Sequence, residues 1–225
     1  MIPYKDDNPT HITPFFTIGI IALNILVFLY QLTSQSGMEK TVYAYGAIPY
    51  YILNFERVQP IHPALTIFSS MFMHGGLFHL GGNMLYLWIF GNNIEDRLGH
   101  LRFIVFYLFC GIVAAYAQVI TNPNSFTPMI GASGAVSGIL GAYLLLFPKA
   151  GIYTFVFLGF FITTVKVPAL IVIGFWAILQ FVNGLISTGA GLKGGVAWFA
   201  HVGGFLAGIL TIKLWLPRRP KRWLI

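Results

Sequence analysis

Two glycine-rich stretches carry the residue types that could perform nucleophilic chemistry. The first, at 131–138, reads Gly-Ala-Ser-Gly-Ala-Val-Ser-Gly and places Ser133 at the start of an apolar run, and the second, at 200–208, contains His201. A serine hydroxyl becomes nucleophilic when a neighbouring base takes its proton, and a neutral histidine is the usual base. A serine among glycines is by itself more typical of helix packing. Together with His201, it predicts a Ser-His dyad for acyl transfer.

A third polar group lies at 74–83. His79 and Asn83 are four residues apart, so on a helix they share one face. A tetrahedral intermediate needs hydrogen-bond donors at its oxyanion, which a histidine ring N–H, an Asn amide and the backbone N–H of Ser133 can supply. The alternative for His79 and Asn83 is interhelical hydrogen bonding without chemistry. His74, in the same stretch, is expected to support the preceding loop.

The composition shows where this chemistry would take place. The chain is 57% hydrophobic and only 8% charged, which lies outside the range of soluble globular domains and indicates a polytopic membrane protein. With about 20 residues needed for each crossing, 225 residues leave room for six or seven spans and no separate soluble domain. Most basic residues flank apolar runs, where membrane orientation accounts for them, so nucleic acid is not an expected partner.

We expect one all-α membrane domain over residues 1–225, with six transmembrane helices at 15–32, 77–94, 103–120, 130–147, 167–186 and 197–216. An apolar stretch at 151–165 is only about 15 residues long and is interpreted as interfacial or re-entrant. With six spans and both termini inside, most Lys and Arg residues lie on the cytoplasmic side. The connection at 33–76 then forms a structured outer loop. Ser133, His201 and His79 would lie near the outer ends of their helices, at one depth.

Small residues would let the helices that carry Ser133 and His201 approach closely. Gly134 on one span, and Gly204 and Gly208 on the other, permit contact between the two backbones. The six acidic residues of the chain fall outside this polar cluster in the expected topology. A dyad is therefore expected rather than a triad with a carboxylate.

Taken together, these stretches resemble the rhomboid family of intramembrane serine proteases. The resemblance rests on motifs that occur in order between about Tyr45 and Gly208: His74, His79-x-x-x-Asn83, the turn Gly91-Asn92-Asn93-Ile94-Glu95-Asp96-Arg97-Leu98-Gly99, Gly131-x-Ser133-Gly134, and Ala200-His201-x-x-Gly204-x-x-x-Gly208. The resemblance implies a compact six-helix bundle with a water-filled cavity. In it Ser133 would be the nucleophile and His201 the general base and then acid, with an oxyanion hole of His79, Asn83 and the Ser133 amide.

The resemblance also implies the partners and the moving parts. The substrates would be single-span or polytopic membrane proteins, cleaved within a lipid bilayer and without a cofactor or metal. The fifth helix and the loop around 190–196 would form a gate and cap. One departure is Ser137, one turn after Ser133, where some relatives carry an aromatic ring packed on the catalytic histidine. That departure leaves open what supports His201.

Three other functions stay open from the sequence. A metal-dependent membrane hydrolase could use His74, His79 and His201, although no His-Glu-x-x-His motif is present. A non-catalytic protein that binds transmembrane clients would not require Ser133 and His201 together. A channel or carrier is disfavoured because no charged residue lies at a predicted mid-membrane position.

The size of the chain, without extra domains, favours a prokaryotic plasma membrane. Both termini would be cytoplasmic and the active site would open to the outer side. The natural substrate, its cleavage site, the organism and the oligomeric state do not follow from the sequence.

Overall fold

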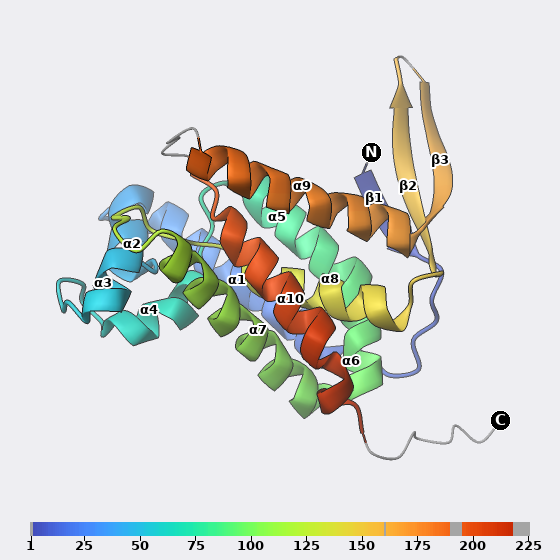
Figure 1. Cartoon of the computed structure of the whole chain (residues 1–225), viewed down its shortest axis with the longest axis horizontal. Helices are drawn as coiled ribbons and strands as arrows, with labels where there is room; N and C mark the ends of the chain where they lie inside the picture. The colour runs from blue at the N-terminus through green and yellow to red at the C-terminus, as the bar shows by residue number, and fades with distance from the viewer. Residues whose placement is uncertain (1, 160, 190–194, 218–225) are drawn as a thin grey trace.

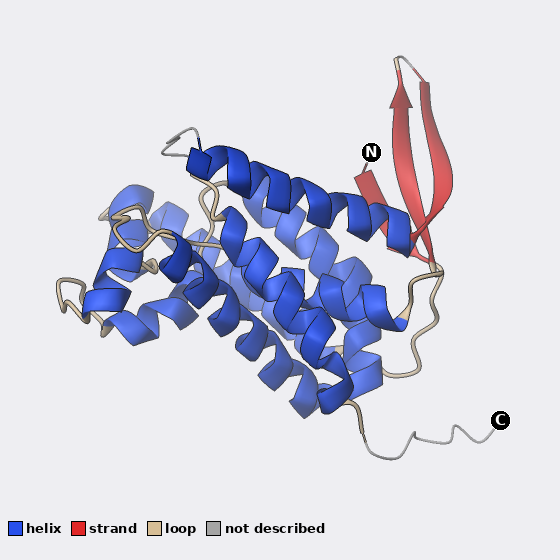
Figure 2. Ribbon diagram, in the orientation of Figure 1, coloured by secondary structure: helices blue, strands red, loops and turns tan. Residues whose placement is uncertain are grey.

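The computed structural model describes residues 2–159, 161–189 and 195–217. Helices make up most of this part, and the strands gather at one end (Figure 2). In chain order the elements are β1 (Ile2–Asp6), α1 (Phe15–Thr33), α2 (Met38–Tyr45), α3 (Pro49–Asn54), α4 (Pro63–Ser70), α5 (Leu77–Tyr86), the π-helical turn η1 (Leu87–Gly91), α6 (Asn92–Leu98), α7 (His100–Thr121), α8 (Ser133–Leu146), β2 (Gly151–Leu158), β3 (Phe161–Pro168), α9 (Ala169–Gly189) and α10 (Trp198–Trp215).

Helix α8 forms the centre of the bundle. Every residue from Ala135 to Tyr143 is buried, which is the pattern of a helix that other helices enclose on all sides. Helices α7 and α10 pack against it, and α10 lies between α7 and α9 (Figure 1). The helix begins at Ser133 rather than at 130 because Gly131 has a φ of 119°, a conformation that L side chains rarely adopt.

In the part of the chain that the structure describes, four helices are long and apolar enough to cross a membrane: α1, α7, α9 and α10. Helix α8 is apolar but has only 14 residues, and α5, η1 and α6 follow one another without a break from Leu77 to Leu98. Large apolar side chains such as Leu26, Phe175 and Leu210 are exposed on the outside of the bundle. Because water would penalise so much exposed apolar surface, this chain is an integral membrane protein.

Glycines set the distance between α8 and α10. A Cβ atom added at Gly204 would collide with the carbonyl oxygen of Gly134, and one added at Gly208 would collide with the carbonyl oxygen of Gly138. The two backbones are therefore in direct contact along two turns. Only glycine permits this approach, which brings the first turn of α8 against the first turns of α10.

The expectation of an all-α chain is wrong for residues 151–168. This stretch forms the antiparallel hairpin of β2 and β3, and β1 pairs with β2 to complete a three-stranded sheet in the order β1-β2-β3. The stretch at 151–165, for which an interfacial or re-entrant position is expected, thus lies in this hairpin. β-branched and aromatic residues dominate the sequence from Ile152 to Val165, and they favour strands. Gly159, at φ 62°, supplies the left-handed residue that the tight connection needs.

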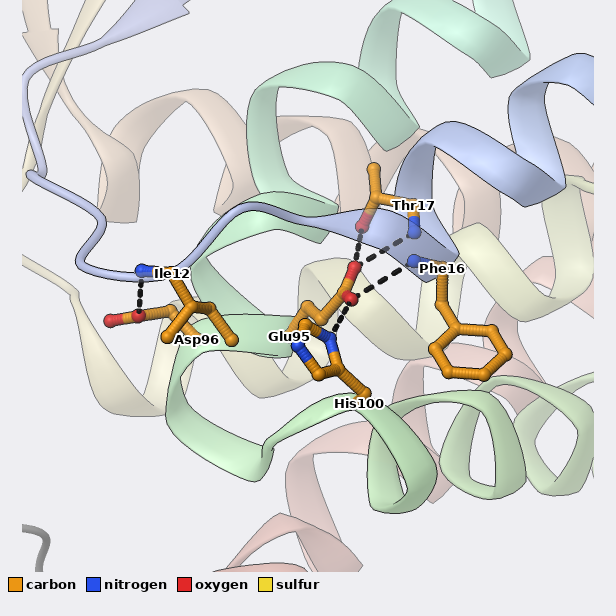
Figure 3. Close-up of polar contacts among 6 residues, drawn as sticks. All are labelled: Ile12, Phe16, Thr17, Glu95, Asp96 and His100. Carbon is orange, nitrogen blue, oxygen red and sulfur yellow. Dashed lines mark hydrogen bonds and ion pairs between the residues drawn. The ribbon is translucent and has the colours of Figure 1, made fainter.

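Two carboxylates of α6 hold the first turn of α1 and the segment that leads into it (Figure 3). Glu95 accepts hydrogen bonds from the backbone N–H of Phe16 at 3.0 Å, and from the N–H and hydroxyl of Thr17 at 2.8 and 2.7 Å. It also lies 2.6 Å from Nδ1 of His100. Asp96 accepts from two backbone N–H groups of the segment that leads into α1. Because α1 has no side-chain cap of its own, buried Glu95 satisfies the free N–H groups of its first turn.

Residues 33–76 contain the short helices α2, α3 and α4, which cover one end of the bundle (Figure 1). Two backbone contacts connect this region to the chain just before α8. Ala47 pairs with Met129 in an isolated antiparallel bridge, and the N–H of Gly131 donates to the carbonyl oxygen of Ser70 at 2.9 Å. The loop thereby fixes the backbone that leads into Ser133.

Candidate active site

The structure brings Ser133 and His201 into hydrogen-bond contact across 68 residues of sequence. The Ser133 hydroxyl oxygen lies 2.8 Å from Nε2 of His201. Ser133 is the first residue of α8, and His201 lies in the first turn of α10. Both side chains are half-buried: the bundle covers part of each of them, and part of each stays accessible. The distance is the one required for proton transfer from a serine hydroxyl to an imidazole.

The second ring nitrogen of His201 has a partner that sequence analysis missed. Nδ1 of His201 lies 2.8 Å from Oε1 of Gln180 on α9, a side chain that is only 8% exposed. The amide group of Gln180 also donates from Nε2 to the carbonyl oxygen of Trp176 at 3.2 Å. A carbonyl oxygen accepts and does not donate, which fixes the orientation of the amide and leaves Oε1 facing the histidine.

This orientation determines the tautomer of His201. Because Oε1 of Gln180 can only accept, Nδ1 carries the hydrogen and Nε2 presents its lone pair to the Ser133 hydroxyl. That tautomer is the one in which a histidine acts as a general base. The signal for Gln180 in the sequence was a polar amide in a largely apolar run, which is costly in a membrane without a partner, but Asn183 in the same run gives the same signal.

Aromatic rings flank His201 from α9 and α10. The ring centroid of Trp176 lies 6.1 Å from that of His201, and the ring of Trp198 lies 6.2 Å away in an edge-on arrangement. Ser137, where an aromatic ring might have been expected, is fully buried and donates to the carbonyl oxygen of Ser133. The aromatic rings beside the histidine therefore come from α9 and from the start of its own helix α10 rather than from α8.

The other polar residues lie beside the backbone that precedes Ser133. A Cβ atom added at Gly131 would lie 2.7 Å from Nε2 of His79 and 3.6 Å from Nδ2 of Asn83. His79 accepts a hydrogen bond at Nδ1 from the backbone N–H of Gly75, at 3.4 Å, so its hydrogen belongs on Nε2. Two side-chain donors, the ring N–H of His79 and the amide of Asn83, thus lie next to the first turn of α8.

His74 holds Asn83 in place. Nδ2 of Asn83 lies 2.9 Å from Nε2 of His74, so the amide donates to the ring and keeps its second hydrogen for another acceptor. The backbone of His74 is fixed in turn by Gln31 of α1, which accepts from its N–H at 3.0 Å and donates to its carbonyl at 3.2 Å. His74 therefore holds α5 through Asn83, and its own backbone is held by α1, while its expected role in supporting the preceding loop stays a prediction.

One cavity adjoins Ser133, and a larger groove lies near the start of α10 without touching Ser133 or His201. The cavity, of about 40 Å³, touches Ser133, Gly131 and Ala200, which is room for a few water molecules. The groove, of about 460 Å³, lies between the chain that follows α7 and the facing ends of α9 and α10, with Asn122 and Trp198 in its lining. Residues 190–194 of the gate and cap expected at 190–196 lie outside the described residues.

Within the described residues, no three His, Cys, Asp or Glu side chains come together as a metal-binding group. His74 and His79 do adjoin each other, with ring centroids 5.0 Å apart, but Nε2 of His74 is engaged by Asn83 and Nε2 of His201 faces Ser133. The alternative of a metal-dependent hydrolase on these three histidines therefore has no ligand cluster to support it.

Comparison with known proteins gives the family. The rhomboid domain matches residues 62–218, which include the dyad and all the polar residues around it. The chain belongs to the rhomboid family. The match begins just before α4 and extends past the end of α10.

Three similar rhomboid proteins illustrate the range of relatives. Rhomboid protein 1, mitochondrial, from Saccharomyces cerevisiae is 32% identical over 151 residues, covering 65% of this chain and 40% of that protein. Rhomboid protease GluP from Bacillus subtilis is 34% identical over 132 residues, covering 58% and 24%. Presenilin-associated rhomboid-like protein, mitochondrial, from Bos taurus is 30% identical over 212 residues, covering 90% and 50%. The chain spans a quarter to a half of the length of these relatives.

These rhomboid relatives correct one expectation. Chain size had favoured a prokaryotic plasma membrane, but similar proteins are named as mitochondrial as well as bacterial. Membership of the family is therefore compatible with either membrane. The apolar helices and the rhomboid domain support an integral membrane location.

Proposed function

We propose that this rhomboid is an intramembrane serine endopeptidase that cleaves transmembrane segments of other membrane proteins through a Ser133-His201 dyad. The observation that carries the proposal is the hydrogen-bonded chain from Ser133 to His201 to Gln180, with both links at 2.8 Å. A structural serine needs only one hydrogen-bond acceptor, which a neighbouring backbone carbonyl could supply. The Ser133 hydroxyl instead faces the lone pair on Nε2 of His201, and the hydrogen bond from Nδ1 to Gln180 fixes that tautomer.

The chemistry follows from this arrangement. Nε2 of His201 takes the Ser133 proton as the hydroxyl oxygen adds to the scissile carbonyl carbon. The developing oxyanion would accept hydrogen bonds from the ring N–H of His79, the free amide hydrogen of Asn83 and the N–H of Ser133 at the start of α8. The imidazolium then protonates the leaving amine. Water, activated by His201 in the same way, releases the acyl group from Ser133.

Gln180 has a positioning role in this mechanism. A carboxylate at that place would stabilise the imidazolium by charge, whereas an amide oxygen only orients the ring and accepts its N–H. The enzyme would thus work as a dyad with a neutral orienting group. The glycine contacts between α8 and α10 keep the two reactive atoms at their distance.

The membrane placement is part of the proposal. The six spans would be α1, the continuous run α5-η1-α6, α7, α8, α9 and α10, with both termini in the cytoplasm. The basic residues Arg97, Arg102, Lys149 and Lys213 then lie on the inner side. The dyad lies at the other end of the helices and would open to the outer side. A substrate helix must unwind locally there because an intact helix hides its carbonyl groups.

The test is cleavage of a single-span model substrate by the purified chain in liposomes, with and without a chelator. Ser133→Ala and His201→Ala are expected to lower kcat by about 10⁴- to 10⁶-fold, because the dyad acts as a unit. Ser137→Ala is the matched control, since it removes the other serine of the same helix turn and should keep most activity. A serine-directed covalent probe should label the unmodified protein and not Ser133→Ala.

The outcome also distinguishes the non-catalytic alternative. A chain that binds transmembrane clients without cutting them would co-purify with the substrate, leave it intact and fail to react with the probe. That result in a folded, correctly inserted protein would overturn the proposal. Loss of cleavage on adding a chelator would point to the metal-dependent alternative instead.

A further inference from the structure

The hairpin of β2 and β3 is the one part of the described chain that projects away from the helices (Figures 1 and 2). Its outer half contains no charged residue: the sequence from 155 to 165 reads FVFLGFFITTV. Three of its large apolar side chains are exposed to an unusual degree, Phe157 at 51%, Phe161 at 78% and Ile162 at 64%. An exposed apolar surface of this size requires a partner.

The strand register places these side chains on both faces of the hairpin. Phe157 lies directly opposite Ile162, so the two share one face. Phe161 is the neighbour of Ile162 along β3 and therefore points to the other face. A protein that packs on a sheet covers one face, and a strand that adds to β3 covers only its edge. A lipid environment contacts both faces of the same tip.

Charged groups of the hairpin are confined to its root, and Thr163 and Thr164 are the polar residues of the outer half. Lys166 forms an ion pair with Asp7 at 2.6 Å, and Asp7 also exchanges backbone and side-chain hydrogen bonds with Gly151. The pairing with β1 likewise covers only the first half of β2, from Ile152 to Phe155. The hairpin is thus charged at its root, where it leaves the bundle, and uncharged and mainly apolar at its tip.

The root is also continuous with a membrane-spanning helix. Pro168 ends β3 and Ala169 begins α9, whose first turns expose Leu170, Ile171 and Phe175. These are the side chains that the helix presents to lipid. The hairpin therefore leaves the bundle at the level where α9 enters the bilayer, at the end of α8 that is far from Ser133. Figure 1 shows it extending sideways past α9 rather than along the helix bundle.

The open edge of β3 limits how deeply the hairpin can enter. Within the described residues β3 pairs with β2 alone, so the backbone N–H and C=O groups of its outer edge have no strand partner. Such groups are not tolerated in the hydrocarbon core, where water is absent. They are tolerated at the headgroup level, where water reaches the backbone and aromatic side chains are favoured.

We propose that the tip of the hairpin is a membrane-interface anchor: it lies in the headgroup region of the leaflet opposite Ser133, with Phe157, Phe161 and Ile162 at the boundary of the acyl chains. The partner is the lipid bilayer itself, and the anchor does not depend on the catalytic proposal. It would hold the entry of α9 at a fixed depth. Since α9 carries Gln180, the anchor and the dyad are connected through one rigid helix.

The experiment places a fluorescent reporter on single cysteines in the full-length protein, reconstituted in phosphatidylcholine-phosphatidylglycerol vesicles. Phe157→Cys and Phe161→Cys, one on each face, are labelled with an environment-sensitive dye in a Cys110→Ala background. Lys149→Cys, just before the root, is the matched control. Lipids with a nitroxide at the headgroup or at different acyl depths report the position of the dye, and iodide reports its exposure to water.

Both tip positions are expected to show blue-shifted emission and strong quenching by shallow nitroxide lipids, whereas the control is quenched by iodide. Quenching of both tip dyes by iodide, with none from lipid, would overturn the proposal and leave the tip in water. Dye-dye energy transfer that rises with protein density, without lipid quenching, would also overturn it and indicate edge pairing between two copies. Size-exclusion chromatography and thermal unfolding of each labelled variant verify that it is folded.

Discussion

The sharpest prediction concerns Gln180, whose amide oxygen receives the Nδ1–H of His201 at 2.8 Å. Replacing it by leucine keeps the approximate volume and removes the acceptor. A buried donor left without a partner costs about 1–3 kcal/mol. The unpaired Nδ1–H destabilises the reactive tautomer of His201 by this amount. Because about 1.4 kcal/mol corresponds to a factor of ten in rate, Gln180→Leu should lower kcat about 5- to 150-fold. KM should change little, because the substrate does not contact this side of the ring.

A second substitution separates orientation from folding. Gln180→Glu retains an acceptor oxygen in the same place and is expected to keep most activity above neutral pH. Its carboxylate favours the protonated imidazole, so the acid limb of the pH-rate profile should move to higher pH. A merely structural role for Gln180 would not move that limb.

The assay is the liposome cleavage assay, run as full kinetics over a range of pH. The matched control is Asn24→Leu, which also replaces a buried amide in a membrane helix. The amide of Asn24 donates to the Ile20 carbonyl of its own helix, and its oxygen has no partner among the described residues. Wild-type kcat in Gln180→Leu would refute the reasoning. So would an equal loss in the leucine and glutamate variants with an unchanged pH profile.

Three further predictions concern the scaffold. Gly208→Ala puts a methyl group onto a facing backbone carbonyl, so it should lower the free energy of unfolding by about 1–3 kcal/mol and abolish most cleavage. Gly174→Ala is the control: open space surrounds this glycine, so thermal unfolding and cleavage should both stay unchanged. Glu95→Ala leaves several buried donors unpaired and should lower the stability by about 3 kcal/mol, with Glu95→Gln losing less; equal unfolding temperatures for the two would contradict the capping role. At the hairpin root, the hydrogen bond from Lys166 lowers the pKa of Asp7, so this contact is fully present above the ordinary carboxyl pKa of about 4 and is lost as the pH falls through the lowered value. The protection of the hairpin amides against hydrogen exchange, taken relative to the intrinsic exchange rate at each pH, should fall only in that acidic range, and protection that does not change with pH would contradict the contact.

The sequence by itself determined the membrane character of the chain and the residues that could react. Composition and the length of the apolar runs are local properties, and they suffice because a bilayer imposes a fixed thickness. Ser133, His201, His79 and Asn83 could be singled out because polar residues among small ones are rare in such runs. The approach of α8 to α10 followed from glycine spacing alone.

Only the tertiary structure decided which groups meet. Gln180 lies 21 residues before His201, and nothing in its own neighbourhood shows that it faces the imidazole. Glu95 caps α1 by accepting from the N–H of Phe16, 79 residues earlier in the chain, which no local pattern predicts. Residues 151–168 could pass for a short apolar helix because periodicity does not separate a buried strand from a helix in so brief a run. The strand conformation depends on pairing with β1, which lies more than 140 residues earlier in the chain. A strand needs a partner strand, and the local sequence does not identify that partner.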